Sequence, residues 1–460
     1  NLRKPSDSDH ADLLARGPQH VQRRLTRTSV AHLDCGGTRV SRCWMCRPGP
    51  ETRFTGAIAG VATFGTAMNR LKAVWREMSV GKKGVLSLAS ATATSQLILF
   101  LATLPLARLY QPEAFGIFVY VSAIASIVSI GATLRFELAI PAAGSGAEAR
   151  GMALAAIRSM FVTAVLMAAV IVLMMGLEDV QLNGQSWDYV WLAPVLLLLY
   201  CTYSIASQLC LRERQYNQLG VRTVLQSSVL SVGQLLAAAF TRTAGGLFFG
   251  DVLGRFVAAL TLGRVAARSI RADSTPTPTF RETFRANRSF PLSLTPASLL
   301  DTAATQAPLL MVGAWFGASA AGYVGLASRM LAVPLALVGV AVSQVLLGEL
   351  AIRVRRGDRE NSQIFMHASK RLLALATCTG LLAAVFAPWA FTLVFGETWA
   401  TSGELARAMA FGAAMTLVWN PMSSVFITYR RLNSFALLSV FRLALTVVAG
   451  LIAFTLNLGL

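Results

Sequence analysis

The sequence is poor in charge for its length. Asp, Glu, Lys and Arg make up only 14% of its 460 residues, whereas 55% of the residues are hydrophobic and the mean hydropathy is +0.57. A soluble domain of this size needs more polar residues than that to cover its surface. The composition therefore excludes a soluble globular protein and predicts an all-α, polytopic membrane protein.

Cysteine and histidine are also scarce, with six and four residues. Three of the cysteines lie in apolar stretches, where a thiol usually packs as a small hydrophobic group: Cys201, Cys210 and Cys378. The spacings form no disulfide framework, and the long apolar runs hold no histidine. We therefore predict neither a cofactor nor a catalytic metal, and the protein is expected not to be an enzyme.

The first 77 residues lack the hydrophobic periodicity of a helix or strand and are rich in Arg, Ser and Pro. We predict that residues 1–77 are mostly disordered, and that Met78 is the natural start of the protein. Cys43 and Cys46 have the spacing of a zinc knuckle, with His32 and Cys35 nearby. One such pair is weak evidence for zinc, so no metal site is predicted there.

From Val85 onward the chain contains long apolar runs that exceed the roughly 20 residues needed to cross a bilayer. Eleven spans are predicted, at 85–107, 115–140, 152–176, 189–211, 219–240, 246–267, 291–316, 320–350, 369–395, 403–429 and 433–456. An odd number of spans would leave Leu460 outside, which predicts a twelfth helix after it.

Basic residues are distributed unevenly over the links between these runs. A net charge of +19 would suit a nucleic-acid-binding protein, but the Lys and Arg residues form short clusters between apolar runs, and we exclude that function. Links after even-numbered runs carry most of the arginines, whereas links after odd-numbered runs contain only Arg108, Arg242 and Arg407, with several acids. The positive-inside rule therefore predicts a cytoplasmic N-terminus and cytoplasmic even-numbered links.

The longest basic link, 268–290, contains a Ser/Thr/Pro-rich stretch and divides the spans into six and five. We predict an N-terminal lobe at 78–267, a cytoplasmic linker at 268–290 and a C-terminal lobe at 291–460.

The two halves contain similar segments after their first span. QPEAFGIFVY begins at Gln111 and GASAAGYVGL begins at Gly317, which places Gly116 and Gly322 in register, 206 residues apart. Because six helices return the chain to the same side of the membrane, this predicts a parallel repeat about an axis along the membrane normal. Chance similarity between apolar helices is the alternative.

Ionisable residues within the predicted spans are expensive, at about 2.5 to 3.5 kcal/mol each on insertion scales, so they should face a bundle interior or a cavity. The candidates are Arg135, Glu137, Asp251, Arg255, Asp301, Arg329, Glu349 and Arg442. Asp251 and Arg255 are four residues apart and can pair on one helix face. Asp301, Arg329 and Arg442 have no partner at helical spacing and need one across helices or in a ligand.

Arginine binds phosphate oxygens bidentately, so a net positive polar cavity favours an anionic, phosphate-bearing substrate. Gln306 and Gln344 extend the set of polar groups inside the spans, although a single Gln often only joins two membrane helices. For Arg135 and Glu137, near the predicted cytoplasmic end of their span, three interpretations stay open. They are a snorkelling ion pair, a substrate-binding element or a gate.

Three segments resemble the bacterial polysaccharide (O-antigen type) flippases of the multidrug/oligosaccharidyl-lipid/polysaccharide exporter superfamily. They are LARLYQPEAFGIF from Leu106, LRFELAIP from Leu134 and the stretch from Trp315 to Ala351. The resemblance implies two six-helix lobes that move an undecaprenyl-pyrophosphate-linked oligosaccharide from the cytoplasmic to the periplasmic leaflet of the bacterial inner membrane. It implies membrane lipid as a partner, with a polysaccharide polymerase and chain-length proteins as candidate partners.

The resemblance assigns Arg135 and Glu137 to the Arg-aromatic-Glu phrase of the family, and Arg329 to a position that tends to be basic there. The substrate-binding or gating candidates are Arg135, Glu137, Arg255, Arg329, Arg442, Gln306 and Gln344. Coupling to a proton or sodium gradient is a hypothesis, with Asp251, Asp301 and Glu349 as candidate carriers. A cation-coupled multidrug antiporter of the same superfamily is the alternative function.

Overall fold

The computed structural model describes residues 80–176, 189–271, 276–335, 361–428 and 432–456, in which all regular structure is helical. Contacts divide the chain into Asn1–Leu71 and Lys72–Leu460, and every described residue belongs to the second unit. The predictions for residues 1–77, including disorder, the start at Met78 and the Cys43/Cys46 pair, lie outside the described residues. The candidates Gln344 and Glu349 do too.

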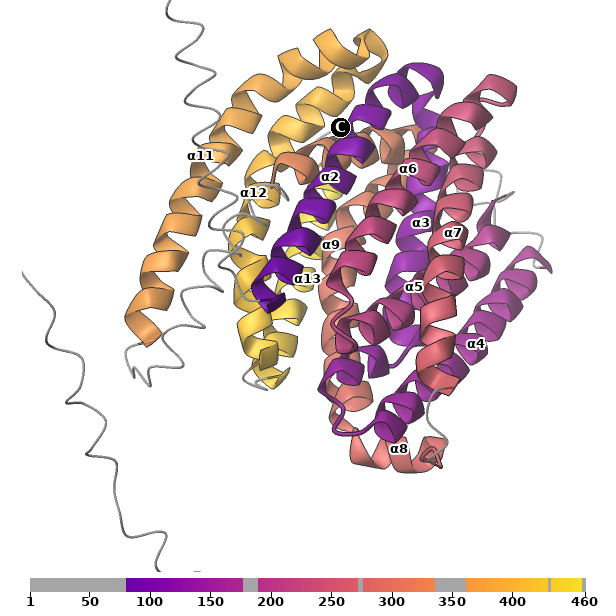
Figure 1. The fold of residues 1–460 in the computed structure, drawn as a ribbon. Helices are drawn as coiled ribbons and strands as arrows, with labels where there is room; N and C mark the ends of the chain where they lie inside the picture. Colours follow the sequence, from indigo (N-terminus) through magenta and orange to yellow (C-terminus); the bar gives the residue numbers. More distant parts are fainter. Residues whose placement is uncertain (1–79, 177–188, 272–275, 336–360, 429–431, 457–460) are drawn as a thin grey trace, which may run out of the picture. The chain divides into compact units, whose positions relative to one another are not determined.

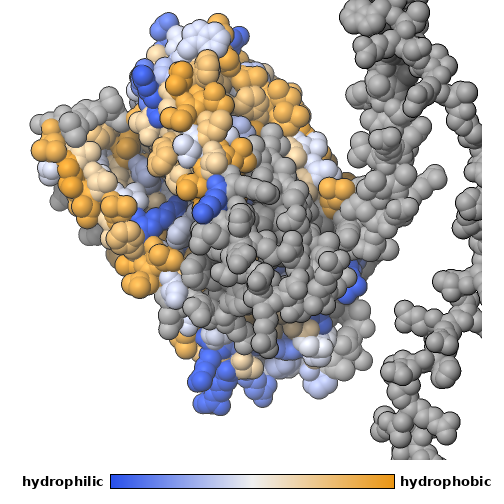
Figure 2. All heavy atoms as spheres, turned by 90° about the vertical axis from the view of Figure 1, so that its left-hand side faces the viewer, coloured by the Kyte–Doolittle hydropathy of each residue, from blue (hydrophilic) through white to orange (hydrophobic). Residues whose placement is uncertain are grey.

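Eight of the described helices are long and apolar enough to cross a membrane. Their outward side chains are strongly hydrophobic, with exposures of 67% for Val165, 68% for Val385 and 71% for Leu437. On the face shown in Figure 2, hydrophobic residues cover much of the described helices, with smaller hydrophilic groups at the top, middle and bottom of the view. Such surfaces suit contact with lipid, which confirms the prediction of an all-α, polytopic membrane protein.

We call the helices before residue 272 the N-terminal bundle. They are α2 (Val80–Leu109), α3 (Pro112–Ala132), α4 (Gly146–Gly176), α5 (Ala193–Arg212), α6 (Tyr216–Phe240) and α7 (Ala244–Arg271) (Figure 1). Helix α6 packs against α2 and α7, and α5 packs against α3, α4 and α7. A short helix, α8 (Phe280–Ala286), follows the bundle, and the π-helical turn Phe290–Leu294 leads into the next span.

We call the remaining helices the C-terminal bundle. They are α9 (Thr295–Phe316), the helical residues 318–335, α11 (Asn361–Phe395), α12 (Ala400–Thr428) and α13 (Leu432–Thr455). Helix α11 packs along α12, and α9 packs along α13. Helix α9 also contacts α3, which joins the two bundles.

The predicted second span, 115–140, is wrong at its C-terminal end. Helix α3 ends at Ala132, because Leu134 and Arg135 adopt left-handed backbone conformations with φ of 49° and 56°. A 3₁₀-helix, η1 (Phe136–Ala142), follows and leads into α4. Arg135 and Glu137 therefore lie on a tight turn after the helix rather than within it.

Helix α3 and the helix at residues 318–335 cross with their backbones in direct contact. A Cβ atom on Gly116 would collide with the carbonyl oxygen of Ala318, and one on Gly322 would collide with the carbonyl oxygen of Pro112. Pro112 and Ala318 are also 206 residues apart, so the two contacts are copies of each other. The crossing is therefore locally two-fold, as the predicted parallel repeat requires.

The two bundles share a hydrophobic core next to this crossing. Phe115 and Phe248 from the N-terminal bundle pack in the same cluster as Phe391 and Trp399 from the C-terminal side. The Trp399 indole Nε1 donates a hydrogen bond to the Ala107 carbonyl over 2.6 Å, and Arg108 donates one to the Val394 carbonyl over 2.9 Å. These bonds hold the bundles together at the end of the molecule where α2 ends and α3 begins.

Candidate functional site

The first charged cluster lies on α7. The Nε of Arg255 donates to both carboxylate oxygens of Asp251, over 3.0 and 3.1 Å, and Asp251 is only 2% exposed. The pairing predicted from the four-residue spacing is confirmed. A buried carboxylate requires such compensation, because an unpaired charge in a bundle interior costs several kcal/mol.

Helix α5 contributes an aromatic residue to this cluster. The guanidinium of Arg255 lies over the Tyr200 ring, 4.0 Å from its centroid, which is a cation–π contact. The Arg255 side chain nevertheless keeps 24% of its surface exposed. One face of the guanidinium is thus held by protein, while the Arg255 side chain as a whole is not fully enclosed.

Arg329, on the helix at residues 318–335, is half-buried. Among the described residues no carboxylate lies within ion-pair distance of it, but the Asp251 charge interacts with it electrostatically. Asp251 thus pairs with Arg255 in its own bundle and acts on Arg329, from the other bundle, only at longer range. The three side chains carry a net positive charge.

A second cluster, in the C-terminal bundle, has the same kinds of residue. Asp301 Oδ1 on α9 accepts hydrogen bonds from Arg442 on α13 over 2.9 Å and from the Trp419 indole on α12 over 3.1 Å. Arg442 also donates to the Thr305 hydroxyl over 2.9 Å, and its guanidinium lies 5.4 Å from the Trp419 ring centroid. The expectation that Asp301 and Arg442 find partners across helices is confirmed.

Gln306 joins the two bundles. Its amide nitrogen on α9 donates to the hydroxyl of Ser126 on α3 over 3.1 Å. This bond lies along the contact between α3 and α9, so Gln306 has a packing role in this conformation. Its availability to a substrate would depend on separation of these two helices.

Arg135 and Glu137 form an ion pair of 3.4 Å on the turn between α3 and α4. Glu137 is 2% exposed, and its Oε2 has no hydrogen-bond partner among the described residues. The intervening Phe136 is fully buried, and its ring centroid lies 6.4 Å from those of Phe280 and Phe284 on α8. The segment 135–137 therefore packs against α8, in the link between the bundles, and it belongs to neither charged cluster.

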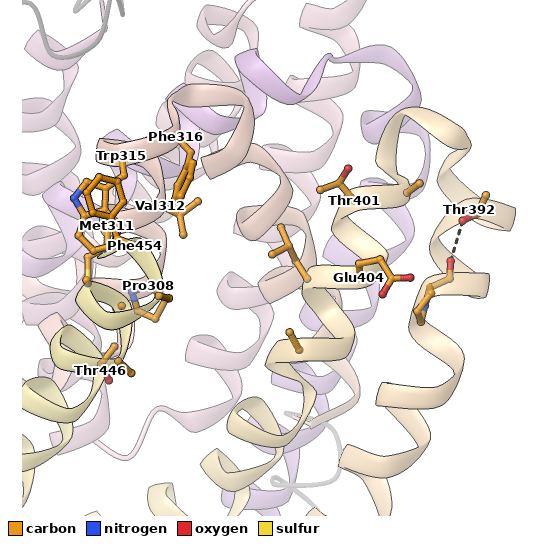
Figure 3. Close-up of a pocket in the computed structure, with 17 residues that line it drawn as sticks. Pro308, Met311, Val312, Trp315, Phe316, Thr392, Thr401, Glu404, Thr446 and Phe454 are labelled. Atoms are coloured by element: carbon orange, nitrogen blue, oxygen red, sulfur yellow. Dashed lines mark hydrogen bonds between the residues drawn. The ribbon is translucent and has the colours of Figure 1, made fainter. Parts of the chain in front are cut away.

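An apolar cavity of about 760 Å³ lies between the α9/α13 pair and the α11/α12 pair. Figure 3 shows Met311, Trp315, Phe316 and Phe454 on one side of it, with Thr401 and Glu404 on the other. Glu404 is its one charged lining residue and pairs with Arg407. None of the predicted site residues lines this cavity, so it does not contribute to an anion site.

Sequence reasoning missed the aromatic members of both clusters. Tyr200 and Trp419 are far from their arginines in the chain, and no spacing rule connects them. In the described residues no group of three or more His, Cys, Asp or Glu side chains could hold a metal ion.

Comparison with known families gives one match over most of the chain. The sequence profile of a family described as "Polysaccharide biosynthesis protein" matches residues 105–404. This range includes both arginines that interact with Asp251. No match was found among curated proteins.

Solved structures with a similar fold are transporters. The chain is similar to a multidrug resistance MATE family transporter of the MOP superfamily in its outward-facing conformation, with a TM-score of 0.53 and 16% identity, over 80% of this chain and 86% of that chain. An inward-facing structure of such a transporter gives a TM-score of 0.49 and 16% identity, over 80% and 85% of the two chains. The first of these likenesses shows that the chain has a MATE-like fold. At 16% identity it does not identify the substrate.

Proposed function

Because this chain belongs to the polysaccharide biosynthesis protein family, we propose that it is a flippase for a lipid-linked oligosaccharide. The substrate would be an undecaprenyl-pyrophosphate-linked repeat unit that crosses from the cytoplasmic to the periplasmic leaflet of a bacterial inner membrane. The distribution of arginines supports a cytoplasmic N-terminus. A polysaccharide polymerase and chain-length proteins would then use the product on the periplasmic side.

The observation that carries the proposal is the group formed by Asp251, Arg255 and Arg329. Asp251 pairs directly with Arg255, whereas no ion pair among the described residues involves Arg329. A diphosphate presents several oxygens with the geometry that guanidinium groups bind best. We expect the diphosphate to bind Arg329 and the open part of Arg255, and Asp251 to keep Arg255 oriented.

Transport then requires the bundles to separate at one end and then at the other, while the prenyl chain stays in lipid. Arg255 and Arg329 come from different bundles, so a ligand that binds both would connect its own position to the relative movement of the bundles. Of the candidate carriers for a coupling ion, Asp301 is the better placed of the two described. Its side chain is 27% exposed, whereas that of Asp251 is 3% exposed.

In cells, Arg329→Ala should abolish surface polysaccharide in a bacterium that depends on this protein, while the amount of protein in the membrane stays unchanged. Arg255 is tested as the double variant Asp251→Asn/Arg255→Gln, which leaves no unpaired buried carboxylate and should also abolish it. Arg407→Ala is the matched control, because Arg407 is 60% exposed and lies outside the site. Normal polysaccharide in the Arg329 and Arg255 variants would refute the assigned role.

Drug export by the same fold is the second candidate function, since the similar solved structures are multidrug transporters. A cationic drug needs an uncompensated acid, whereas the acid at the Arg329 site is outnumbered by arginines. Export of a fluorescent cation by cells that express the protein, lost in Asp301→Asn, would favour this function over the flippase.

A further inference from the structure

Helix α8 has two chemically different faces. Phe280, Thr283 and Phe284 point to the N-terminal bundle, whereas Arg281 and Arg285 lie on the opposite, exposed side. Arg288, one turn further on, is exposed as well. Figure 1 shows α8 across the end of the N-terminal bundle, where the chain passes from α7 to α9.

The inner face of α8 is attached to the bundle by specific contacts. The buried Phe136 ring meets Phe280 and Phe284 edge to face. Thr283 is 3% exposed, and its hydroxyl lies so close to α4 that a Cβ on Gly151 would approach it to 3.0 Å. The position of the helix relative to the bundle is therefore determined by packing.

Glu282 is the one acidic residue of α8, and its side chain takes part in the N-terminal cap of the helix. Glu282 accepts a hydrogen bond from the backbone N–H of Thr279 over 2.8 Å, while the Thr279 hydroxyl accepts one from the backbone N–H of Glu282. This is a complete capping box at the start of the helix. None of the ion pairs found among the described residues involves Arg281, Arg285 or Arg288.

Arg281 and Arg285 on α8, and Arg288 just after it, thus face outward on the link between α7 and α9. Because α8 closely follows α7, which is long and apolar enough to cross a membrane, we expect α8 to lie near the boundary between lipid and water, with its apolar face on the protein and its basic face outward. Phe280, which is 37% exposed at the edge of the helix, suits the same boundary. Guanidinium groups bind phosphate oxygens well, and each basic residue near an anionic leaflet adds to membrane attraction.

We propose that the basic face of α8 binds the headgroups of anionic phospholipids, with Phe136 as the residue that holds this face toward the leaflet. The proposal gives the Arg-Phe-Glu turn a positioning role for the inter-bundle link. It goes beyond the proposed transport function and does not depend on which substrate is moved.

Hydrogen–deuterium exchange of residues 279–288 tests the proposal on the full chain in lipid nanodiscs. Discs of phosphatidylcholine alone are compared with discs that also contain phosphatidylglycerol. We expect slower exchange with the anionic lipid and a loss of roughly fivefold in this protection for each arginine removed, so that R281Q/R285Q approaches the value in neutral lipid. R281K/R285K should keep most of the effect, and R242Q/R407Q, which removes two arginines outside α8, should keep all of it.

Equal exchange of the unmodified protein in the two lipid compositions would overturn the proposal, and this comparison needs no variant. Retention of the lipid effect in R281Q/R285Q would also overturn it. If inorganic phosphate added to neutral discs reproduces the protection, the ligand is a free anion and lipid binding is excluded. Lipid flipping is measured separately, so a protein that fails to flip but keeps the phosphatidylglycerol effect would contradict the transport function alone.

Discussion

Gly116 and Gly322 occupy equivalent places on the two halves of the chain and lie in contact with each other's helix. Each position has room for no side chain, because the nearest atom on the other helix is a backbone oxygen. Gly322→Ala should therefore lower stability by about 1 to 3 kcal/mol through overpacking, measured as a lower unfolding temperature in detergent. Gly412→Ala is the control, since nothing lies within 4 Å of its added Cβ. Equal unfolding temperatures for the two variants would contradict the close crossing.

Trp399 should hold the two bundles closed at the end of α2. Trp399→Phe removes the hydrogen bond to Ala107 but keeps an aromatic ring beside Phe115 and Tyr323. Loss of this hydrogen bond should cost about 1 kcal/mol. The fraction of molecules in which the bundles are separated at this end should then rise roughly fivefold. A cysteine at Ser319, in the cleft of about 1110 Å³ at this end, should then react faster with a water-soluble thiol reagent. Trp315→Phe, in the separate apolar cavity, should leave the rate unchanged, and a rate unaffected by Trp399→Phe would exclude a closing role.

Asp301 and Arg442 should be coupled energetically. A double-mutant cycle with Asp301→Asn and Arg442→Gln should give a coupling energy of about 1 to 2 kcal/mol in the free energy of unfolding. We expect less than for a fully buried pair, because both side chains are 27% exposed. The exposed pair Glu404 and Arg407 is the reference and should give less than about 1 kcal/mol. Similar coupling energies for the two pairs would show that the inner ion pair has no special role.

The first turn of α8 should stay folded in mild acid. The hydrogen bonds from Thr279 hold the pKa of Glu282 below its ordinary value of 4.5. A lowered folded-state pKa means that the stabilisation is complete above 4.5 and is lost only as the pH falls through the lowered value. Exchange of residues 279–288 should stay slow to a pH below 4.5 and then increase, whereas Glu282→Ala should exchange fast throughout. A transition above pH 4.5 would contradict the capping box.

Much of the fold could be predicted from the sequence, because the bilayer leaves helices as the main solution for long apolar runs. The end of the second span could not. Helix ends are usually marked by Gly or Pro, whereas α3 is terminated by Leu134 and Arg135 in left-handed conformations that their side chains disfavour. The residue types around position 134 therefore did not indicate that the helix ends there.

The site was predictable only where its geometry is local. Asp251 and Arg255 share a helix face, so spacing alone identified the pair. For Asp301 and Arg442 the cost of an isolated charge indicated that partners must exist, but only the packing of α9, α12 and α13 shows which they are. Tyr200 and Trp419 carried no signal, because an aromatic residue in a membrane helix is usually simple packing.

Flipping of a lipid-linked sugar by the purified protein in proteoliposomes tests the central claim most directly. The substrate is a fluorescent undecaprenyl-pyrophosphate-linked saccharide, and its appearance in the opposite leaflet is followed with a membrane-impermeant quencher. We predict flipping by the unmodified protein, a decrease of roughly tenfold or more in Arg329→Gln through loss of charge-assisted hydrogen bonds, and an unchanged rate in Arg407→Gln. Absence of flipping, or an Arg329→Gln rate equal to that of the unmodified protein, would contradict the account.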